Sequence, residues 1–174
     1  MRYSGSSSYK YIDKLITNSN NLLIIAPYID SYYASFIASN SRNKNIKIVS
    51  SSIESNALKI LNNYRKGLII RFFFILALLF LVPIYMNLIS IILISIAIFL
   101  IAIFPSYENI KIKKPKDFVH MKLYIGDNMA ITGSANLTYN GTHKNIETIE
   151  IITDINEINE LKREFYKLWK RSRY

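Results

Sequence analysis

The chain has 174 residues, no cysteine and a formal net charge of +10. This length predicts one domain with a substantial core, and the lack of cysteine excludes a disulfide framework and a thiolate metal site. A basic surface attracts polyanions, either nucleic acid or the anionic face of a membrane, although the same charge also suits an ordinary solvated surface.

Short apolar runs alternate with helical patterns in the first part of the chain. In order we expect a helix over Tyr9–Thr17, a strand over Leu22–Ala26, a helix capped by Asp30 or Ser31 that runs to Ala38, a strand over Ile46–Val49 and a helix over Ile53–Arg65. Such alternation is typical of an α/β domain with a largely parallel sheet.

The pattern resumes in the last part of the chain. We expect strands over Asn109–Lys113, Phe118–Ile125, Met129–Thr132 and Ile146–Thr153, and a closing amphipathic helix over Asn156–Lys170. Gly126-Asp127-Asn128 is a turn-forming sequence, so it joins the second and third of these strands.

The block Leu68–Phe104 is almost wholly apolar and contains a single charge, Arg71. It divides into Leu68–Met86 and Leu88–Phe104, each close to the roughly 20 residues that cross a bilayer. Because neither segment has a polar stripe, the block predicts an inserted two-helix transmembrane hairpin. The alternative is a helical hairpin buried in a dimer interface.

Lysine and arginine residues flank the apolar block on both sides. The positive-inside rule therefore predicts a multi-pass membrane protein with two spans and its catalytic domain on the cytoplasmic side. We expect residues 1–67 and 105–174 to form the two halves of one domain, with residues 68–104 inserted between them.

One short stretch carries residues suited to phosphoryl chemistry. His120, Lys122, Asp127, Gly133-Ser134 and Asn136 follow the pattern H-x-K-x4-D-x6-G-S-x-N. If the first two lie in a strand, alternation places both side chains on one face. A nucleophilic imidazole, a fixed cation and an amide donor would then converge on one point, as phosphoryl transfer requires.

This pattern resembles the HKD motif of the phospholipase D superfamily. The sequence Gly133-Ser134-Ala135-Asn136-Leu137-Thr138, followed by Asn145-Ile146-Glu147, strengthens the likeness. Within the superfamily the chain is most similar to the small endonucleases with one motif per chain, and the likeness covers nearly everything outside Leu68–Phe104. It implies a phospholipase D-like α/β fold with a mixed, largely parallel sheet flanked by helices.

The resemblance also implies a role for each residue of the motif. His120 would attack phosphorus and form a phosphohistidine, while Lys122 and Asn136 would hold the phosphate oxygens. The hydroxyl of Ser134 would assist them. Glu147 would hold the histidine ring in its reactive tautomer.

Asp127 would be a structural residue next to a turn. The family uses no cofactor and no metal, and the sequence has no visible metal-ligand cluster. The second histidine, His143, lies in a polar stretch and is expected to be an exposed loop residue or at most a contact at the substrate rim. Tyr28 is a candidate for lining the pocket, although a tyrosine at a strand end is usually a packing residue.

Family chemistry requires two histidines, one to attack and one to protonate the leaving oxygen. The single motif therefore implies a homodimer with a shared active site. The favoured function is an endonuclease acting on nucleic acid, and the alternative is a phospholipase D-type hydrolase of membrane phospholipids. A third function, an inactive membrane scaffold, is disfavoured because the motif is intact.

Overall fold

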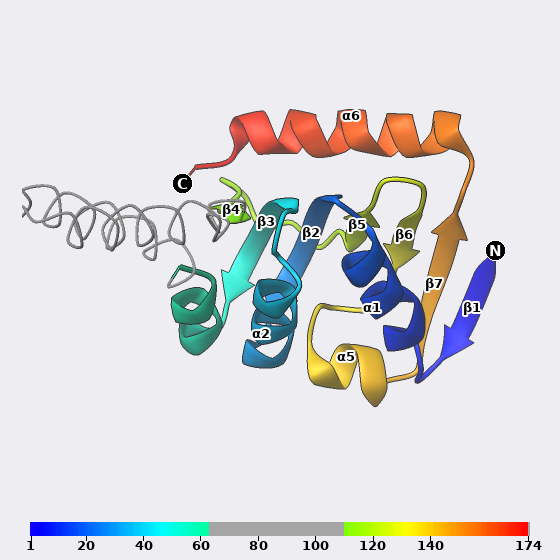
Figure 1. Cartoon of the computed structure of the whole chain (residues 1–174), viewed down its shortest axis with the longest axis horizontal. Coiled ribbons are helices and arrows are strands. Elements are labelled where there is room, and N and C mark those ends of the chain that lie inside the picture. Colours follow the sequence, from blue (N-terminus) through cyan, green and yellow to red (C-terminus); the bar gives the residue numbers. More distant parts are fainter. Residues whose placement is uncertain (63–109, 174) are drawn as a thin grey trace, which may run out of the picture.

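The computed structural model describes residues 1–62 and 110–173, and within them seven strands form one sheet in the order β1-β7-β6-β5-β2-β3-β4 (Figure 1). The strands are β1 (Arg2–Gly5), β2 (Asn21–Ile29), β3 (Asn45–Ile53), β4 (Ile110–Lys113), β5 (Leu123–Ile125), β6 (Ala130–Gly133) and β7 (Glu147–Ile152). The helices are α1 (Tyr9–Asn18), α2 (Ser31–Ser39), α5 (Tyr139–His143) and α6 (Ile155–Arg171), and residues 55–62 are helical as well.

Helices cover both faces of the sheet (Figure 1). The helix α6 runs along one face, where its Ile158 and Phe165 are fully buried. The helices α1, α2 and α5 lie on the other face, over the larger core cluster. Ile24 of β2 faces this larger cluster, whereas its neighbours Leu23 and Ile25 face α6. The central strand β2 is therefore buried on both faces, as its continuous apolar sequence predicts.

The sheet is mixed, and its parallel part is smaller than expected. Strand β3 pairs parallel with both β2 and β4, whereas β2–β5, β5–β6, β6–β7 and β1–β7 are antiparallel pairs. The prediction of a largely parallel sheet is wrong, because β5, β6, β7 and β1 each join the sheet antiparallel to their neighbours. The turn at residues 126–128, which was expected, accounts for the β5–β6 pair. Such a connection permits only antiparallel pairing.

Register brings several distant segments to one edge of the sheet. Ile25 in the middle of β2 pairs with Leu123 at the start of β5, so the second half of β2 extends past this point, and Thr132 near the end of β6 pairs with the same Leu123. Gly133 pairs with Ile149 near the start of β7. The ends of β2, β3, β4 and β6 and the starts of β5 and β7 therefore meet at this edge, which we call the motif edge.

Some elements differ from the sequence-based expectations. The strand expected over Phe118–Ile125 is limited to Leu123–Ile125, and the polar opening of the chain forms β1. Strand β3 continues to Ile53, so the next helix begins later than expected, and Leu58 of that helix is exposed. The chain contains β1 because β7 offers it a partner, which no periodicity within Arg2–Gly5 could reveal.

The expected location in a membrane is contradicted. No helix within residues 1–62 and 110–173 combines the length and the apolar character that crossing a bilayer requires. The segment 68–104, for which the hairpin was predicted, lies outside the described residues. The domain boundaries at residues 67 and 105 also lie outside them and stay predictions.

Candidate active site

His120 lies in an extended segment just before β5 rather than inside a strand, and its side chain is exposed. The preceding residue fixes this segment to β3. The backbone N–H of Val119 donates to Ser51 Oγ at 2.8 Å, and this hydroxyl donates in turn to the Val119 carbonyl at 3.2 Å. The histidine is therefore presented to solvent at the motif edge by a segment that is itself anchored.

Lys122 is only 6% exposed, and its ammonium lies against the imidazole of His120. Its Nζ is 3.1 Å from Nε2 and 3.2 Å from Nδ1 of the ring, and it donates to the His120 carbonyl at 3.0 Å. Burial lowers the pKa of Lys122, and the negative charge of Glu147 opposes this shift. The cation and the imidazole thus lie side by side, although His120 is not in a strand.

Glu147 is held by two polar side chains at the start of β7. Ser134 Oγ donates to its Oε2, and the Asn145 amide donates to its Oε1 at 3.3 Å. Ser134 is fixed in turn by Thr148, whose N–H donates to Ser134 Oγ at 3.0 Å. Within the described residues the hydrogen bonds of Glu147 go to Ser134 and Asn145 and not to His120, for which the resemblance had implied it.

Asn136 follows β6 and carries an unpaired polar atom. Its Oδ1 is buried and has no hydrogen-bond partner among residues 1–62 and 110–173. Such an atom costs roughly 1–3 kcal/mol. The backbone around it is tightly packed, because a Cβ at Gly141 of α5 would lie 2.9 Å from the Asn136 carbonyl oxygen. The unpaired atom is an acceptor, so the group of Asn136 that can bind a phosphate oxygen is its amide NH2, which donates.

Gly133, between Lys122 and Asn136 in the motif, occupies a backbone conformation that other residues avoid. Its φ is +153°, and a Cβ added there would lie 2.2 Å from the carbonyl oxygen of Thr148. Strand β6 can therefore pass this close to β7, and place Ser134 beside Glu147, only with glycine at this position.

Asp127 lies at the opposite end of β5 from Lys122, so it is remote from the motif edge. Its carboxylate accepts hydrogen bonds from the Asn20 N–H at 2.7 Å, the Asn21 N–H at 3.1 Å and the Asn21 amide at 3.0 Å. Burial raises the pKa of Asp127, but these hydrogen bonds outweigh it and the pKa is lowered overall. The residue ties the β5–β6 turn to the connection between α1 and β2.

His143 is not an exposed loop residue, because residues 139–143 form the helix α5. Its ring is half-buried and stacks on the rings of Tyr9 and Tyr139. The ring centroids are 4.2 Å apart with an interplanar angle of 5° for Tyr9, and 4.5 Å apart with an angle of 14° for Tyr139. The Nδ1 of His143 lies 2.8 Å from Thr142 Oγ1. A short helix with few apolar residues has no detectable periodicity, so no pattern in the chain predicted this helix.

An aromatic side chain, Phe118, lies next to His120, and a second, Tyr28, lies next to Phe118. The ring of Phe118 is 6.3 Å from the His120 ring and 6.0 Å from the ring of Tyr28. Phe118 and Tyr28 are both exposed, at 60% and 45%. Phe118 was not singled out from the sequence, although its position two residues before His120 on the same side of an extended segment could have indicated it.

The motif edge thus gathers His120, Lys122, Ser134, Asn136 and Glu147, whereas Asp127 lies at the other edge. Among residues 1–62 and 110–173 no group of three or more histidine, aspartate or glutamate side chains is arranged to hold a metal ion.

Residues 101–169 match the family described as the phospholipase D-like domain of cardiolipin synthase. A search of curated protein sequences found no match. Solved structures similar to the chain include NucT from Helicobacter pylori, with a TM-score of 0.59, 14% identity and coverage of 95% of this chain and 89% of that one. Nuc from Salmonella typhimurium, a phospholipase D family member, has a TM-score of 0.59 and 15% identity, and the similarity covers 99% of this chain and 96% of that one.

A phosphatidylserine synthase from Haemophilus influenzae Rd KW20 is also similar, with a TM-score of 0.55 and 14% identity over 99% of this chain and 38% of that one. At these identities the structural likeness shows the fold, and the family match covers the sequence in which the motif lies. The comparisons thus show a phospholipase D-like fold, and together with the match of residues 101–169 they support a phosphodiester hydrolase of that superfamily.

Proposed function

We propose that the chain is an endonuclease that hydrolyses phosphodiester bonds of nucleic acid through a phosphohistidine intermediate on His120. The observation that carries the proposal is the position of the Lys122 ammonium against both ring nitrogens of an exposed imidazole. An exposed nucleophile beside a fixed cation is the minimum arrangement for attack on an anionic phosphorus centre.

The reaction divides into two displacements. In the first, a ring nitrogen of His120 attacks phosphorus, the phosphorus–oxygen bond to the leaving group breaks, and the leaving oxygen takes a proton. In the second, water attacks phosphorus, the phosphorus–nitrogen bond to His120 breaks and restores the imidazole, and the proton of the water returns to the group that protonated the leaving oxygen. Lys122 and the amide of Asn136 bind the non-bridging oxygens in both steps. Ser134, just after β6, donates a hydrogen bond to Glu147 at the start of β7, and the charge of Glu147 favours the protonated form of Lys122.

The proton for the leaving oxygen requires an acid on the side of phosphorus opposite to His120. We propose that it is His120 of a second copy of the chain, in a homodimer with a shared site. Apolar side chains near the motif edge support an interface there, since Phe118, Met121 and Ile146 are 60%, 47% and 83% exposed. Phe118 and Met121 flank His120 in the sequence, and Ile146 precedes Glu147. Apolar side chains that gather beside a site commonly mark an interaction surface.

Nucleic acid is the proposed substrate because the chain carries a net charge of +10 and three lysines, Lys113, Lys114 and Lys116, in the segment that leads to His120. Phospholipid is the alternative. It is favoured by the match of residues 101–169 to the phospholipase D-like domain of cardiolipin synthase and by the fold shared with a phosphatidylserine synthase.

The test offers the purified protein, with EDTA present, single-stranded DNA, duplex DNA, RNA and phosphatidylglycerol vesicles in parallel. The proposal expects fragments of nucleic acid from the wild type and none from His120→Ala. Release of a lipid headgroup with intact nucleic acid would instead identify the alternative.

A further inference from the structure

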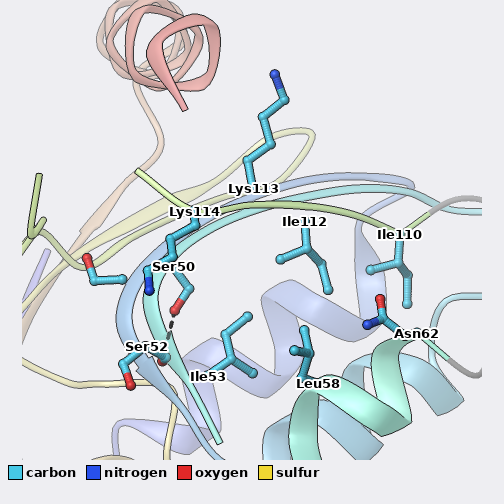
Figure 2. A pocket seen from close by; sticks show the side chains of 10 residues that line it. Ser50, Ser52, Ile53, Leu58, Asn62, Ile110, Ile112, Lys113 and Lys114 are labelled. Carbon is cyan, nitrogen blue, oxygen red and sulfur yellow. Dashed lines mark hydrogen bonds between the residues drawn. The ribbon is translucent and has the colours of Figure 1, made fainter. Parts of the chain in front are cut away.

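A pocket of about 520 Å³ lies beside the motif edge, between the end of β3, strand β4 and the helical residues 55–62 (Figure 2). Pockets that bind small molecules have volumes of roughly 300–1,000 Å³. The pocket runs along β4 and the end of β3, and one side of it reaches the carboxyl ends of these parallel strands, where α/β sheets commonly bind ligands. The residues that line it are Ser50, Ser51, Ser52, Ile53, Leu58, Asn62, Ile110, Ile112, Lys113 and Lys114.

The pocket has an apolar floor and a charged rim, and strand alternation produces both. Ile110, Ile112 and Lys114 are two residues apart along β4 and its end, so they share one face of the strand. Ile110 is buried, Ile112 half-buried and Lys114 exposed, so the lining passes from aliphatic to cationic toward the motif edge. In Figure 2, Lys114 turns toward Ser50, while Lys113 extends away, where its Nζ donates to the Trp169 carbonyl of α6 at 3.3 Å.

Two chains of contacts join the pocket to the candidate active site. Ser51, in the pocket wall, forms both hydrogen bonds that anchor Val119 next to His120. Ser52 pairs with Tyr28 of β2, whose ring contacts Phe118 beside the histidine. The pocket is therefore separated from the attacking imidazole by a few side chains along the same edge.

We propose that this pocket binds one nucleotide of the substrate strand, next to the nucleotide whose phosphate is cleaved. The inference rests on the proposed nuclease function. The aliphatic side chains of Ile53, Leu58 and Ile112 contact the base, and the amide of Asn62 at the rim provides a donor and an acceptor for its polar edge. Lys114 pairs with the phosphate of that nucleotide.

A charge-matched pair of variants tests the cationic rim. Lys114→Gln and Lys111→Gln each remove one charge from β4 or its end, but Lys111 is on the opposite face of the strand. We expect Lys114→Gln, and not Lys111→Gln, to raise KM for a short single-stranded oligonucleotide about tenfold. Measured by fluorescence anisotropy with His120→Ala chains, the slope of log Kd against log salt should also fall by about 1.

A larger side chain in the pocket tests whether its apolar floor binds the base. Leu58 is 40% exposed, so Leu58→Trp adds volume to the pocket without replacing a core side chain. Ile155→Trp, at the exposed start of α6, is the control for an added indole. We expect only Leu58→Trp to lower the ratio of oligonucleotide hydrolysis to hydrolysis of bis(p-nitrophenyl) phosphate, which has no neighbouring nucleotide.

The two proposals fail in different ways. If wild-type protein cuts oligonucleotides and the pocket variants equal their controls, the nucleotide site is wrong and the nuclease function stands. If Leu58→Trp instead impairs hydrolysis of phosphatidylglycerol vesicles alone, the pocket takes a lipid chain. If wild-type protein hydrolyses bis(p-nitrophenyl) phosphate but no nucleic acid, both proposals are overturned.

Discussion

Asp30 accepts a hydrogen bond from the backbone N–H of Tyr139 at 2.6 Å, and its other carboxylate oxygen accepts one from the N–H of Tyr33 at 3.0 Å. One side chain therefore serves the first turns of two helices, α5 and α2, that lie far apart in the sequence. We expect Asp30→Ala to lower the free energy of unfolding by about 2 kcal/mol, because each lost cap costs about 1 kcal/mol. Urea denaturation measures the loss.

Asp154→Ala is the matched control, since Asp154 caps α6 alone, through the N–H groups of Asn156 and Glu157. Its cost should be about 1 kcal/mol. Equal losses for Asp30→Ala and Asp154→Ala would show that the bond from Asp30 to α5 contributes nothing to stability.

Replacing the attacking group or the cation should stop the reaction. We expect His120→Ala and Lys122→Ala each to lower hydrolysis of bis(p-nitrophenyl) phosphate by at least roughly a thousandfold, because both act on the transition state. Circular dichroism should show folded protein in both cases. EDTA should have no effect on the wild type, and activity that disappears in EDTA and returns with a divalent ion would contradict the mechanism.

The pH dependence of the reaction follows from the environment of Lys122. Burial lowers the pKa of this lysine, and only the protonated ammonium binds phosphate oxygens. Activity should therefore fall on the alkaline side at a pH below roughly 10.4, the ordinary lysine value. Lys122→Arg should move this limb of the kcat profile to higher pH, because guanidinium stays protonated.

A substitution of Glu147 checks whether Lys122 is the group that titrates in the alkaline limb. The negative charge of Glu147 raises the pKa of Lys122, so Glu147→Gln should move the alkaline limb to lower pH. A limb that has the same position in the wild type, Lys122→Arg and Glu147→Gln would show that another group titrates there.

A shared active site has a quantitative signature. His120→Ala chains are mixed with wild type under conditions in which subunits exchange. The activity that remains should be proportional to the square of the wild-type fraction. A mixed dimer has one imidazole where the proposed reaction requires two. A strictly linear decrease would mean that each chain works alone.

Asp127 should matter for stability rather than for turnover, because it lies at the edge of the sheet opposite to His120. Its pKa is lower in the folded chain than its ordinary value. Its contribution is therefore fully present above about pH 3.9 and is lost as pH falls through the lowered folded value. Asp127→Asn should reduce the free energy of unfolding at neutral pH and weaken its decline in acid, with kcat nearly unchanged. A kcat loss like that of His120→Ala would contradict this role.

The sequence predicts best those elements whose own residues determine their environment. Strand β2 is continuously apolar and is buried on both faces, and α6 carries its apolar side chains at helical spacing toward the sheet. By contrast, β1 exists because β7 pairs with it, and α5 is held by Asp30 from a distant part of the chain. Such elements depend on partners that no local pattern contains.

The candidate site shows the same division. The spacing of His120 and Lys122 predicts neighbouring side chains, and the two are in contact although the strand begins only at Leu123. Alternation holds in any extended segment, so the side chains of His120 and Lys122 lie on one side even outside a strand. The two hydrogen bonds of Ser51 to Val119 and the bond from Ser134 to Glu147 could not be predicted, because they depend on how separate segments approach.

Within the motif, folding restricts Gly133 more strictly than it restricts His120. The positive φ and the 2.2 Å approach to the Thr148 carbonyl leave no room for any side chain. In a library that randomises every position from Lys122 to Asn136, selection for folded protein alone should return only glycine at 133, while His120 outside that window could vary freely under the same selection. The residue that performs the chemistry is thus replaceable as far as folding is concerned, and the residue without a side chain is not.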